Sequence, residues 1–454
     1  MSEILFHYDK VHPTTWVYLS SLLMIGLFFK FSRLWSVRNL DLIFLILLAP
    51  GLLLVENGLL RQSGAMQQGG YIWLFAMSGI FLVRLLIDPM MVRRPLLEPN
   101  LSVGGMTFIG ASLLLFLMAN VFNSKSTRTD QDGARAAEKL QARQTVTADE
   151  KPLATYGPGY PVLHLLPTIS TQMLMIESTA SASPAELDRS REAVYVAVAR
   201  TMAILSHIAI VAGMILIGYR HFDNIRTGIA AAMLYLLLPY TAQLTGRVDH
   251  VLPAALLVWA VQWYRQPFIS GMFIGLAVGS YYYPAFLLPL WVGFYWQRGL
   301  LRFSVGVIST VLLLVATLVF MADSFASFWE LVRQMFSWSS TFTLQQPEGF
   351  WSFDYIDPVY RIPVLAAFIA LCGSLAIWPP QKNLGTLMSC SAAVMVGTQF
   401  WYARGGGLYM AWYMPLLLLT IFRPNLEDRV ALSVLGEGWF PRRRSGLFGI
   451  VRAA

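Results

Sequence analysis

Long apolar runs recur along this chain of 454 residues, and many reach the length of about 18 residues that crosses a bilayer as a helix. Hydrophobic residues make up 56% of the chain, charged residues make up 13%, and the mean hydropathy is +0.56. A soluble domain carries about 25% charged residues, so this chain has too few to cover a globular surface. We therefore expect an all-α, polytopic membrane protein, and we exclude a soluble enzyme, a disordered chain and a secreted disulfide scaffold.

The apolar runs, with the polar and proline residues between them, define about thirteen candidate spans. Pro284 divides one long apolar run into two short helices, and no internal repeat is present. The candidate spans are residues 14–31, 41–58, 70–88, 103–121, 193–218, 226–243, 250–264, 268–281, 283–297, 304–322, 361–378, 384–401 and 408–422.

Basic residues follow alternate spans, which indicates that the connections carrying them share the cytoplasmic side. These residues are Lys30, Arg33, Arg38, Arg93, Arg94, Arg220, Arg226, Arg265, Arg298, Arg302, Lys382, Arg423, Arg429 and Arg442 to Arg444. The stretch from Met1 to Pro13 has neither a basic region nor a small-residue cleavage site, so we expect the first span to remain in the mature protein. The sequence predicts a multi-pass protein of the plasma (inner) membrane, with its N-terminus outside and its C-terminus in the cytoplasm.

Two long segments lie on the predicted outer side, residues 121–192 and 323–360. We expect the polar stretch 124–151 to be a mobile, solvent-exposed loop. The apolar stretch 155–174 contains three prolines, and we expect it to lie in the interface or to re-enter the membrane. In residues 325–338 the apolar side chains share one helical face, a pattern typical of a helix on the membrane surface. The sequence therefore places aqueous chemistry on the outer side.

The polar outer segment contains two candidate catalytic carboxylates, Asp130 and Asp132. They are either charges of a solvated loop or a general base that accepts a proton from a hydroxyl nucleophile. The following motif YGPGYPVLHLLP supplies Tyr156, Tyr160 and His164. These three are either interfacial and structural residues or a platform for a lipid-linked substrate.

Two further polar groups lie at membrane edges. The motif TGRVDH brings Arg247, Asp249 and His250 together between two apolar spans, as an interfacial cluster or as part of a site. Arg404 precedes three glycines, which form either a flexible turn or a backbone that approaches a ligand closely. Because arginine suits phosphate, Arg404 is a candidate phosphate ligand. Tyr409, in the same segment, is a candidate for substrate binding.

Other functional classes lack their signatures. No CxxC, HExxH or GxxxxGK[ST] spacing occurs, so we expect no metal and no cofactor. Cys372 and Cys390 lie inside apolar runs and are interpreted as small buried hydrophobic residues. The net charge of +8 is the excess that basic cytoplasmic connections give, so we expect no nucleic-acid partner.

The order of several motifs is distinctive. An outer loop with an acidic residue is followed by an alanine-rich helix, DQDGARAAEKLQA (130–142). The next motifs along the chain are YGPGYPVLHLLP, ARTMAILSHIAIVAGMILI, LLLPYTAQLTGRVDHVLPAALLVWAV, GLAVGSYYYPAFLLPLWVGFYWQRGLLRF and YMAWYMPLLLLTIFRP. This series resembles the GT-C glycosyltransferases, in particular the polyprenyl-phosphate-mannose-dependent mannosyltransferase branch. The resemblance covers about residues 103–425. It leaves residues 1–102 as an N-terminal three-span extension and residues 426–454 as a basic cytoplasmic tail.

The resemblance implies an inverting hexosyltransferase of the cell envelope. It would move a mannose-like hexose from a polyprenyl-phosphate donor to a lipid, glycan or protein acceptor on the outer face of the membrane. The alanine pair after DQDGAR matches the family register and makes Asp130 the base, with Asp132 as the alternative. Arg404 and Arg247 would bind the donor phosphate. The residues that would bind substrate are Tyr156, Tyr160, His164, Asp249, His250 and Tyr409.

Two other functions remain open. One is a transporter or flippase of a lipid-linked substrate, although transporters usually show inverted repeats and ionisable groups near the midplane. The other is a non-catalytic membrane scaffold with a GT-C-like fold. The scaffold alternative is based on a departure from the family pattern. The family usually carries a basic residue after GLA and before the Tyr-Pro pair, and this residue is absent here, where the chain reads GSYYYP.

Overall fold

Helices account for nearly all of the part of the chain that the computed structural model describes. The described residues are 12–91, 98–124, 126–142, 156–176, 184–322, 324–335, 349–353, 356–402, 408–426 and 429–435. Within these ranges no strand forms, and Asn383 and Val430 make one isolated β-bridge. The expected all-α fold class is confirmed for the described residues.

The α-helices are α2 (Pro13–Phe28), α3 (Val37–Ile46), α4 (Leu48–Leu60), α5 (Gly64–Ile87), α6 (Val103–Asn123), α7 (Arg128–Gln141), α8 (Gly159–Ile176), α9 (Pro184–His221), α10 (Ile225–Leu237), α11 (Pro239–Gln243), α12 (Val248–Gln262), α13 (Pro267–Ser280), α14 (Leu288–Tyr295), α15 (Leu300–Ala316), α16 (Phe325–Met335), α18 (Arg361–Ile377), α19 (Leu384–Trp401), α20 (Met414–Phe422) and α21 (Ala431–Val434). The 3-10 helices are η1 (Phe31–Arg33), η2 (Asp88–Met90), η4 (Tyr283–Leu287), η5 (Thr317–Met321), η6 (Gly349–Ser352), η7 (Pro358–Tyr360) and η9 (Met410–Trp412).

Apolar helices occupy every segment predicted as a span. Among the described helical segments, five are long and apolar enough to cross a membrane: Val37–Leu60, Gly64–Met90, Val103–Asn123, Glu186–His221 and Leu300–Phe320. Six others are apolar but shorter, at 10–17 residues: Pro13–Phe28, Ile225–Leu237, Val248–Gln262, Pro267–Ser280, Tyr283–Tyr295 and Arg361–Ile377. The protein is therefore membrane-embedded, whereas the count of thirteen spans remains a prediction.

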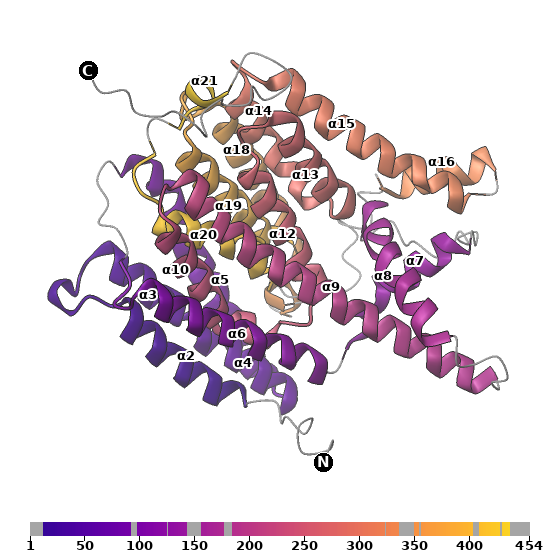
Figure 1. The fold of residues 1–454 in the computed structure, drawn as a ribbon, viewed down its shortest axis with the longest axis horizontal. Helices are drawn as coiled ribbons and strands as arrows, with labels where there is room; N and C mark the ends of the chain where they lie inside the picture. Colours follow the sequence, from indigo (N-terminus) through magenta and orange to yellow (C-terminus); the bar gives the residue numbers. More distant parts are fainter. Residues whose placement is uncertain are drawn as a thin grey trace, which may run out of the picture.

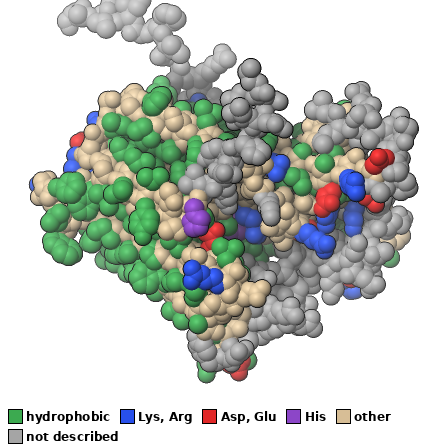
Figure 2. Space-filling view, turned by 90° about the horizontal axis from the view of Figure 1, so that it is seen from below, with side chains coloured by type: hydrophobic (Ala, Val, Ile, Leu, Met, Phe, Trp, Pro, Cys, Tyr) green, Lys and Arg blue, Asp and Glu red, His purple; other side chains and the backbone are tan. Residues whose placement is uncertain are grey.

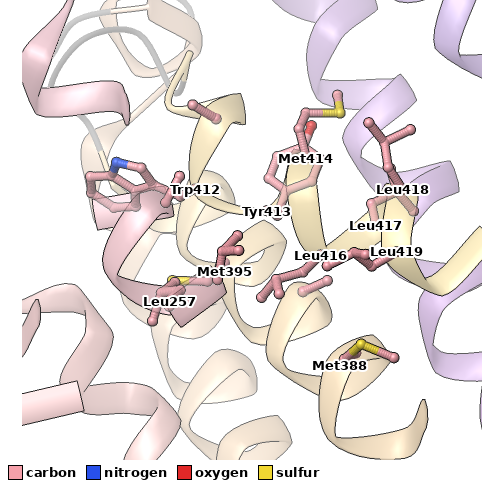
Figure 3. Packing of buried hydrophobic residues seen from close by; sticks show 14 of the residues in the cluster. Leu257, Met388, Met395, Trp412, Tyr413, Met414, Leu416, Leu417, Leu418 and Leu419 are labelled. Carbon is pink, nitrogen blue, oxygen red and sulfur yellow. The ribbon is translucent and has the colours of Figure 1, made fainter. Parts of the chain in front are cut away.

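The most deeply buried part of the bundle surrounds α20. Every residue of α20 is buried, and so is every residue of α19 except Phe400. Side chains of α20, α19 and α12 pack together there, among them Leu416, Met395 and Leu257 (Figure 3). A helix that is apolar on all sides, such as α20, is compatible with such a central position.

The N-terminal helices pack on this core through buried charges as well as apolar contacts. Arg84 of α5 pairs with Asp41 of α3 at 2.7 Å and with Asp88 of η2 at 2.9 Å. Asp88 also pairs with Arg423, which follows α20, at 2.8 Å. Because Arg423 is almost fully buried, it needs Asp88 as a counter-charge, and the buried Asp88 is shared between Arg423 and Arg84. This ion network joins residues 1–102 to the rest of the chain.

Three amphipathic or partly polar helices, α7, α8 and α16, lie at one end of the bundle, where α7 and α8 pack against α9 and α16 follows α15 (Figure 1). Glu186–His221 has 36 residues, or roughly 54 Å of helix, which exceeds the roughly 30 Å hydrocarbon thickness. Figure 2 shows charged side chains gathered at this end and a broad apolar surface over the other side of the molecule.

The structure corrects one expectation about this end. The alanine-rich helix predicted over residues 130–142 is confirmed as α7 (Arg128–Gln141), but it is packed against the bundle rather than part of a mobile, exposed loop. This helix buries a face of mostly small residues that includes Gly133, Ala134 and Ala137, against α8 and α9. Composition suggested a loop because the other face is highly charged. By contrast, the predicted amphipathic helix is confirmed as α16, with Phe325 exposed and Leu331 buried.

Candidate functional site

Asp130 lies in the first turn of α7, where its side chain closes the helix start. Its Oδ2 accepts hydrogen bonds from the backbone N–H of Thr127 at 2.8 Å and from the Thr127 hydroxyl at 2.6 Å. This capping box satisfies a backbone donor that the helix itself leaves free. The side chain is held in one position as a result. Asp130 is only 4% exposed, so it is not the solvated loop carboxylate expected from the sequence.

Arg247, at the start of α12, connects Asp130 to a second carboxylate. Its Nε lies 3.2 Å from Asp130 Oδ1. The same guanidinium donates to Asp249, from Nε to Oδ1 at 3.1 Å and from Nη2 to Oδ2 at 2.9 Å. Two buried carboxylates therefore share one arginine, which lies between α7 and the bundle.

The third polar residue of TGRVDH, His250, belongs to a buried aromatic group. The hydroxyl of Tyr240 lies 2.5 Å from His250 Nδ1 and donates to the carbonyl of Leu408 at 2.9 Å. The ring of Tyr409 lies 4.6 Å from the His250 ring. The indole N–H of Trp412 donates to the carbonyl of Asp249 at 3.0 Å. Residues from α11, α12 and η9 thus form a buried, hydrogen-bonded cluster beside Arg247.

A second cluster of aromatic side chains lies around the start of α8 and consists of Tyr156, Tyr160 and His164. Tyr156 stacks on Tyr160 at 4.3 Å, and the Tyr160 ring lies 5.4 Å from Tyr281 at the end of α13. A Cβ on Gly133 of α7 would lie 2.5 Å from the His164 ring. Only glycine allows this approach, so residue 133 brings His164 against the helix that carries Asp130.

Several buried polar atoms around Asp130 have no hydrogen-bond partner among the described residues. They are Asp130 Oδ1, His164 Nε2 and Ser280 Oγ, together with the hydroxyls of Tyr160 and Tyr281, which interact with each other and have no further partner there. Buried polar atoms are nearly always paired, so each such group needs a reason. A bound ligand rich in hydroxyl groups is one such reason, because hydroxyls both donate and accept.

His164 is suited to accept a hydrogen bond from such a ligand. Its Nδ1 donates to the carbonyl of Tyr160 at 2.8 Å. Burial lowers its pKa to about 4, against the opposing effect of that bond, so the ring is neutral at neutral pH. With the proton on Nδ1, the unpaired Nε2 is an acceptor.

The pKa of Asp130 is raised above its ordinary value of 3.8. Burial is the main cause, and the repulsion of Asp249 adds to it. The two bonds from Thr127 and the charge of Arg247 oppose this rise. The carboxylate is therefore more basic than an exposed aspartate, which suits proton transfer from a hydroxyl.

Asp132 is half-buried on the same helix. Burial also raises its pKa, while the charge of Arg135 lowers it. Among the described residues Asp132 forms no ion pair with Arg247, whereas Asp130 does. The geometry thus brings Asp130, Arg247, Asp249 and His250 near the aromatic residues Tyr156, Tyr160 and His164 at the start of α8, with Asp132 beside them.

Arg404 lies outside the described residues, so its role as a phosphate ligand stays a prediction. Within the described chain, no group of three His, Cys, Asp or Glu side chains gathers where it could hold a metal ion.

Sequence reasoning missed four contributors to this region. Thr127 was readable, since a threonine three residues before an aspartate is a helix-start signal. Ser280 and Tyr281 stand directly before the Tyr-Tyr-Pro sequence, but no local pattern shows that they meet α8. Tyr240 was quoted in a motif without a role, because its contact with His250 depends on the turn between α11 and α12.

Comparison with known proteins returned no match: no family model, no curated protein and no solved structure matches this chain. The resemblance to the GT-C glycosyltransferases therefore depends on the sequence motifs alone, and the site is interpreted from its own geometry.

Proposed function

We propose that this protein is a membrane glycosyltransferase that moves a hexose from a polyprenyl-phosphate donor to a hydroxyl of a lipid, glycan or protein acceptor. The observation that carries the proposal is the buried Asp130 carboxylate, paired with Arg247 and surrounded by unpartnered polar atoms. The proposed site belongs to the outer face of the plasma (inner) membrane.

In this mechanism Asp130 is the general base. The acceptor hydroxyl gives its proton to Asp130 Oδ1 while the acceptor oxygen bonds to the anomeric carbon of the donor. The bond from that carbon to the phosphate oxygen breaks, and its electron pair leaves with the lipid phosphate. A single displacement of this kind inverts the anomeric centre and needs one carboxylate. The protonated Asp130 then returns its proton to solvent.

The leaving phosphate gains charge, so cationic donors lower the barrier to its departure. Arg247 is beside the base and has N–H groups beyond those that bind Asp249. Arg404 is the second proposed cation. The hexose itself would bind His164 Nε2 and the hydroxyls of Tyr160 and Tyr281. The apolar polyprenyl tail of the donor stays in the bilayer, which explains a site at the end of membrane helices.

The orientation of the helices is part of the proposal and has its own test. Arg128 on α7 and Ser32 after α2 are both exposed, and the two native cysteines are buried. In intact cells an impermeant thiol reagent should label Arg128→Cys and should not label Ser32→Cys. The opposite labelling would put the site in the cytoplasm and overturn the assignment to the outer face.

The activity is tested with purified protein in liposomes, given a radiolabelled polyprenyl-phosphate hexose and an alkyl glycoside acceptor. The proposal predicts one labelled glycoside product for each polyprenyl phosphate released. Movement of intact donor between the leaflets without product would indicate the transporter instead. Neither product nor movement, with hexoses of several configurations, would favour the non-catalytic scaffold.

A further inference from the structure

A cavity of about 530 Å³ opens at the end of the bundle opposite α7. It lies between α14, the end of α18 and α21 (Figure 1). The connection after α14 fixes one side of it, because Arg298 Nη1 donates to the carbonyl of Leu432 at 2.9 Å. Its lining includes Val292, Trp296, Ile377 and Leu432.

Large apolar side chains remain exposed at this cavity. Ile377 is 79% exposed, Trp296 is 68% exposed and Leu432 is 46% exposed. Trp378, the neighbour of Ile377, is also exposed. Exposed tryptophans of membrane proteins gather at headgroup depth, where an indole meets both lipid tails and water. The cavity therefore lies beside lipid, at the boundary between the acyl chains and the headgroups.

One ammonium group lies inside this apolar lining. Lys382 is 5% exposed, and its Nζ donates to the carbonyls of Ala376 at 3.0 Å and Pro379 at 2.9 Å. An ammonium has three N–H donors, so one remains. The described lining of the cavity contains no Asp or Glu, and no carboxylate pairs with Lys382 in the described chain.

This ammonium belongs to the lining of the cavity and is packed closely against α14. A Cβ on Gly293 would lie 2.3 Å from the carbonyl oxygen of Ala376 and 3.3 Å from Lys382 Nζ, so glycine at residue 293 lets α14 approach the end of α18 and this ammonium. Gln297 and Gln381 are exposed lining residues with amide groups. A cation without a counter-charge, with amide donors beside it and apolar walls around it, matches an anionic amphiphile.

We propose that this cavity binds an anionic phospholipid of the adjoining leaflet. Its phosphate takes the remaining N–H of Lys382, and its acyl chains lie against Trp296, Ile377 and Leu432. Basic pockets between membrane helices recognise acidic lipid headgroups in this way. The binding does not depend on glycosyl transfer, so its test needs no sugar donor.

The test measures the binding of phosphatidylglycerol and phosphatidylcholine to the purified protein in detergent by native mass spectrometry. Wild type should prefer phosphatidylglycerol by about fivefold or more, the effect of one lysine on an anionic lipid. Lys382→Met should remove that preference. The matched control Lys30→Met removes an exposed ammonium on the same predicted side, outside the cavity, and should keep the preference.

A second variant separates loss of binding from loss of folding. Val292→Trp fills the cavity without touching the charge, and it should weaken phosphatidylglycerol binding in protein that elutes as a single species. Glycerol 3-phosphate at equal concentration should not compete, because it lacks acyl chains. The proposal is overturned by an equal affinity of wild type for the two lipids, by a preference that persists in Lys382→Met, or by competition from glycerol 3-phosphate.

Discussion

Replacing Arg247 with glutamine should change how the activity depends on pH. Arg247 lowers the pKa of Asp130, against the larger effect of burial. Without that charge the pKa of Asp130 rises further, so the base stays protonated up to a higher pH. The acidic limb of the pH profile of kcat/KM should therefore move toward alkaline pH in Arg247→Gln.

The size of this effect follows from the geometry. Two unit charges about 4 Å apart interact by about 4 kcal/mol at an effective dielectric constant of about 20. The Arg247 side chain is 26% exposed and is shared with Asp249, so we take roughly a third of that value. The resulting ~1.4 kcal/mol corresponds to about tenfold lower activity on the acidic limb. A lower plateau of kcat/KM at high pH would indicate the separate loss of phosphate binding by Arg247.

The assay is hexose transfer in liposomes between about pH 5 and pH 9, with Arg135→Gln as the control. Arg135 lowers the pKa of Asp132 and is not among the main causes of the shift in the pKa of Asp130. If Asp132 is the base, Arg135→Gln moves the limb and Arg247→Gln does not. An acidic limb that stays in place in Arg247→Gln would refute the assignment of Asp130 as a base tuned by Arg247.

Three further outcomes are expected. Burial raises the pKa of Asp130 above its unfolded value, so the bound proton stabilises the folded state below about pH 4, and this contribution is lost as the pH rises through the folded pKa. Thermal unfolding in detergent should therefore show a smaller loss of stability between pH 4 and pH 7 in Asp130→Asn than in wild type. Equal losses would contradict the burial of this charge. Asp88→Asn leaves the buried Arg423 without its carboxylate and should lower the free energy of unfolding by about 3–5 kcal/mol. An unchanged Tm would show that the ion network does not join the N-terminal helices to the core. Arg404→Lys should lose about tenfold or more in turnover, because lysine cannot form the two parallel hydrogen bonds that a guanidinium makes to a phosphate. Unchanged turnover and donor affinity in this variant would remove Arg404 from the site.

The helices were predictable because each apolar run is a local property of the sequence. The division of residues 268–297 by proline is an example, since the structure has α13, η4 and α14 there. The number of spans was less predictable. Segments such as Val248–Gln262 are apolar but short, and whether such a helix crosses the bilayer depends on its neighbours rather than on its own length.

The candidate site was predictable as a set of residues but not as a geometry. Asp130 looked exposed because charged residues surround it in sequence. Its burial depends on Gly133, Ala134 and Ala137, which let α7 pack closely on α8 and α9. Small residues at helical spacing indicate a face that can pack closely, but they do not show which helices elsewhere in the chain pack against it. Likewise, the pair of Arg247 with Asp249 is local, whereas its pair with Asp130 exists only in the fold.

The most direct test of the central claim is the rate of hexose transfer by Asp130→Asn, compared with wild type and with Asp132→Asn, in protein shown to be folded. A general base contributes about 10²–10⁴-fold, so Asp130→Asn should lose that much while Asp132→Asn keeps most of its activity. Loss in Asp132→Asn alone would move the base by two residues. Full activity in both variants would contradict the proposed mechanism.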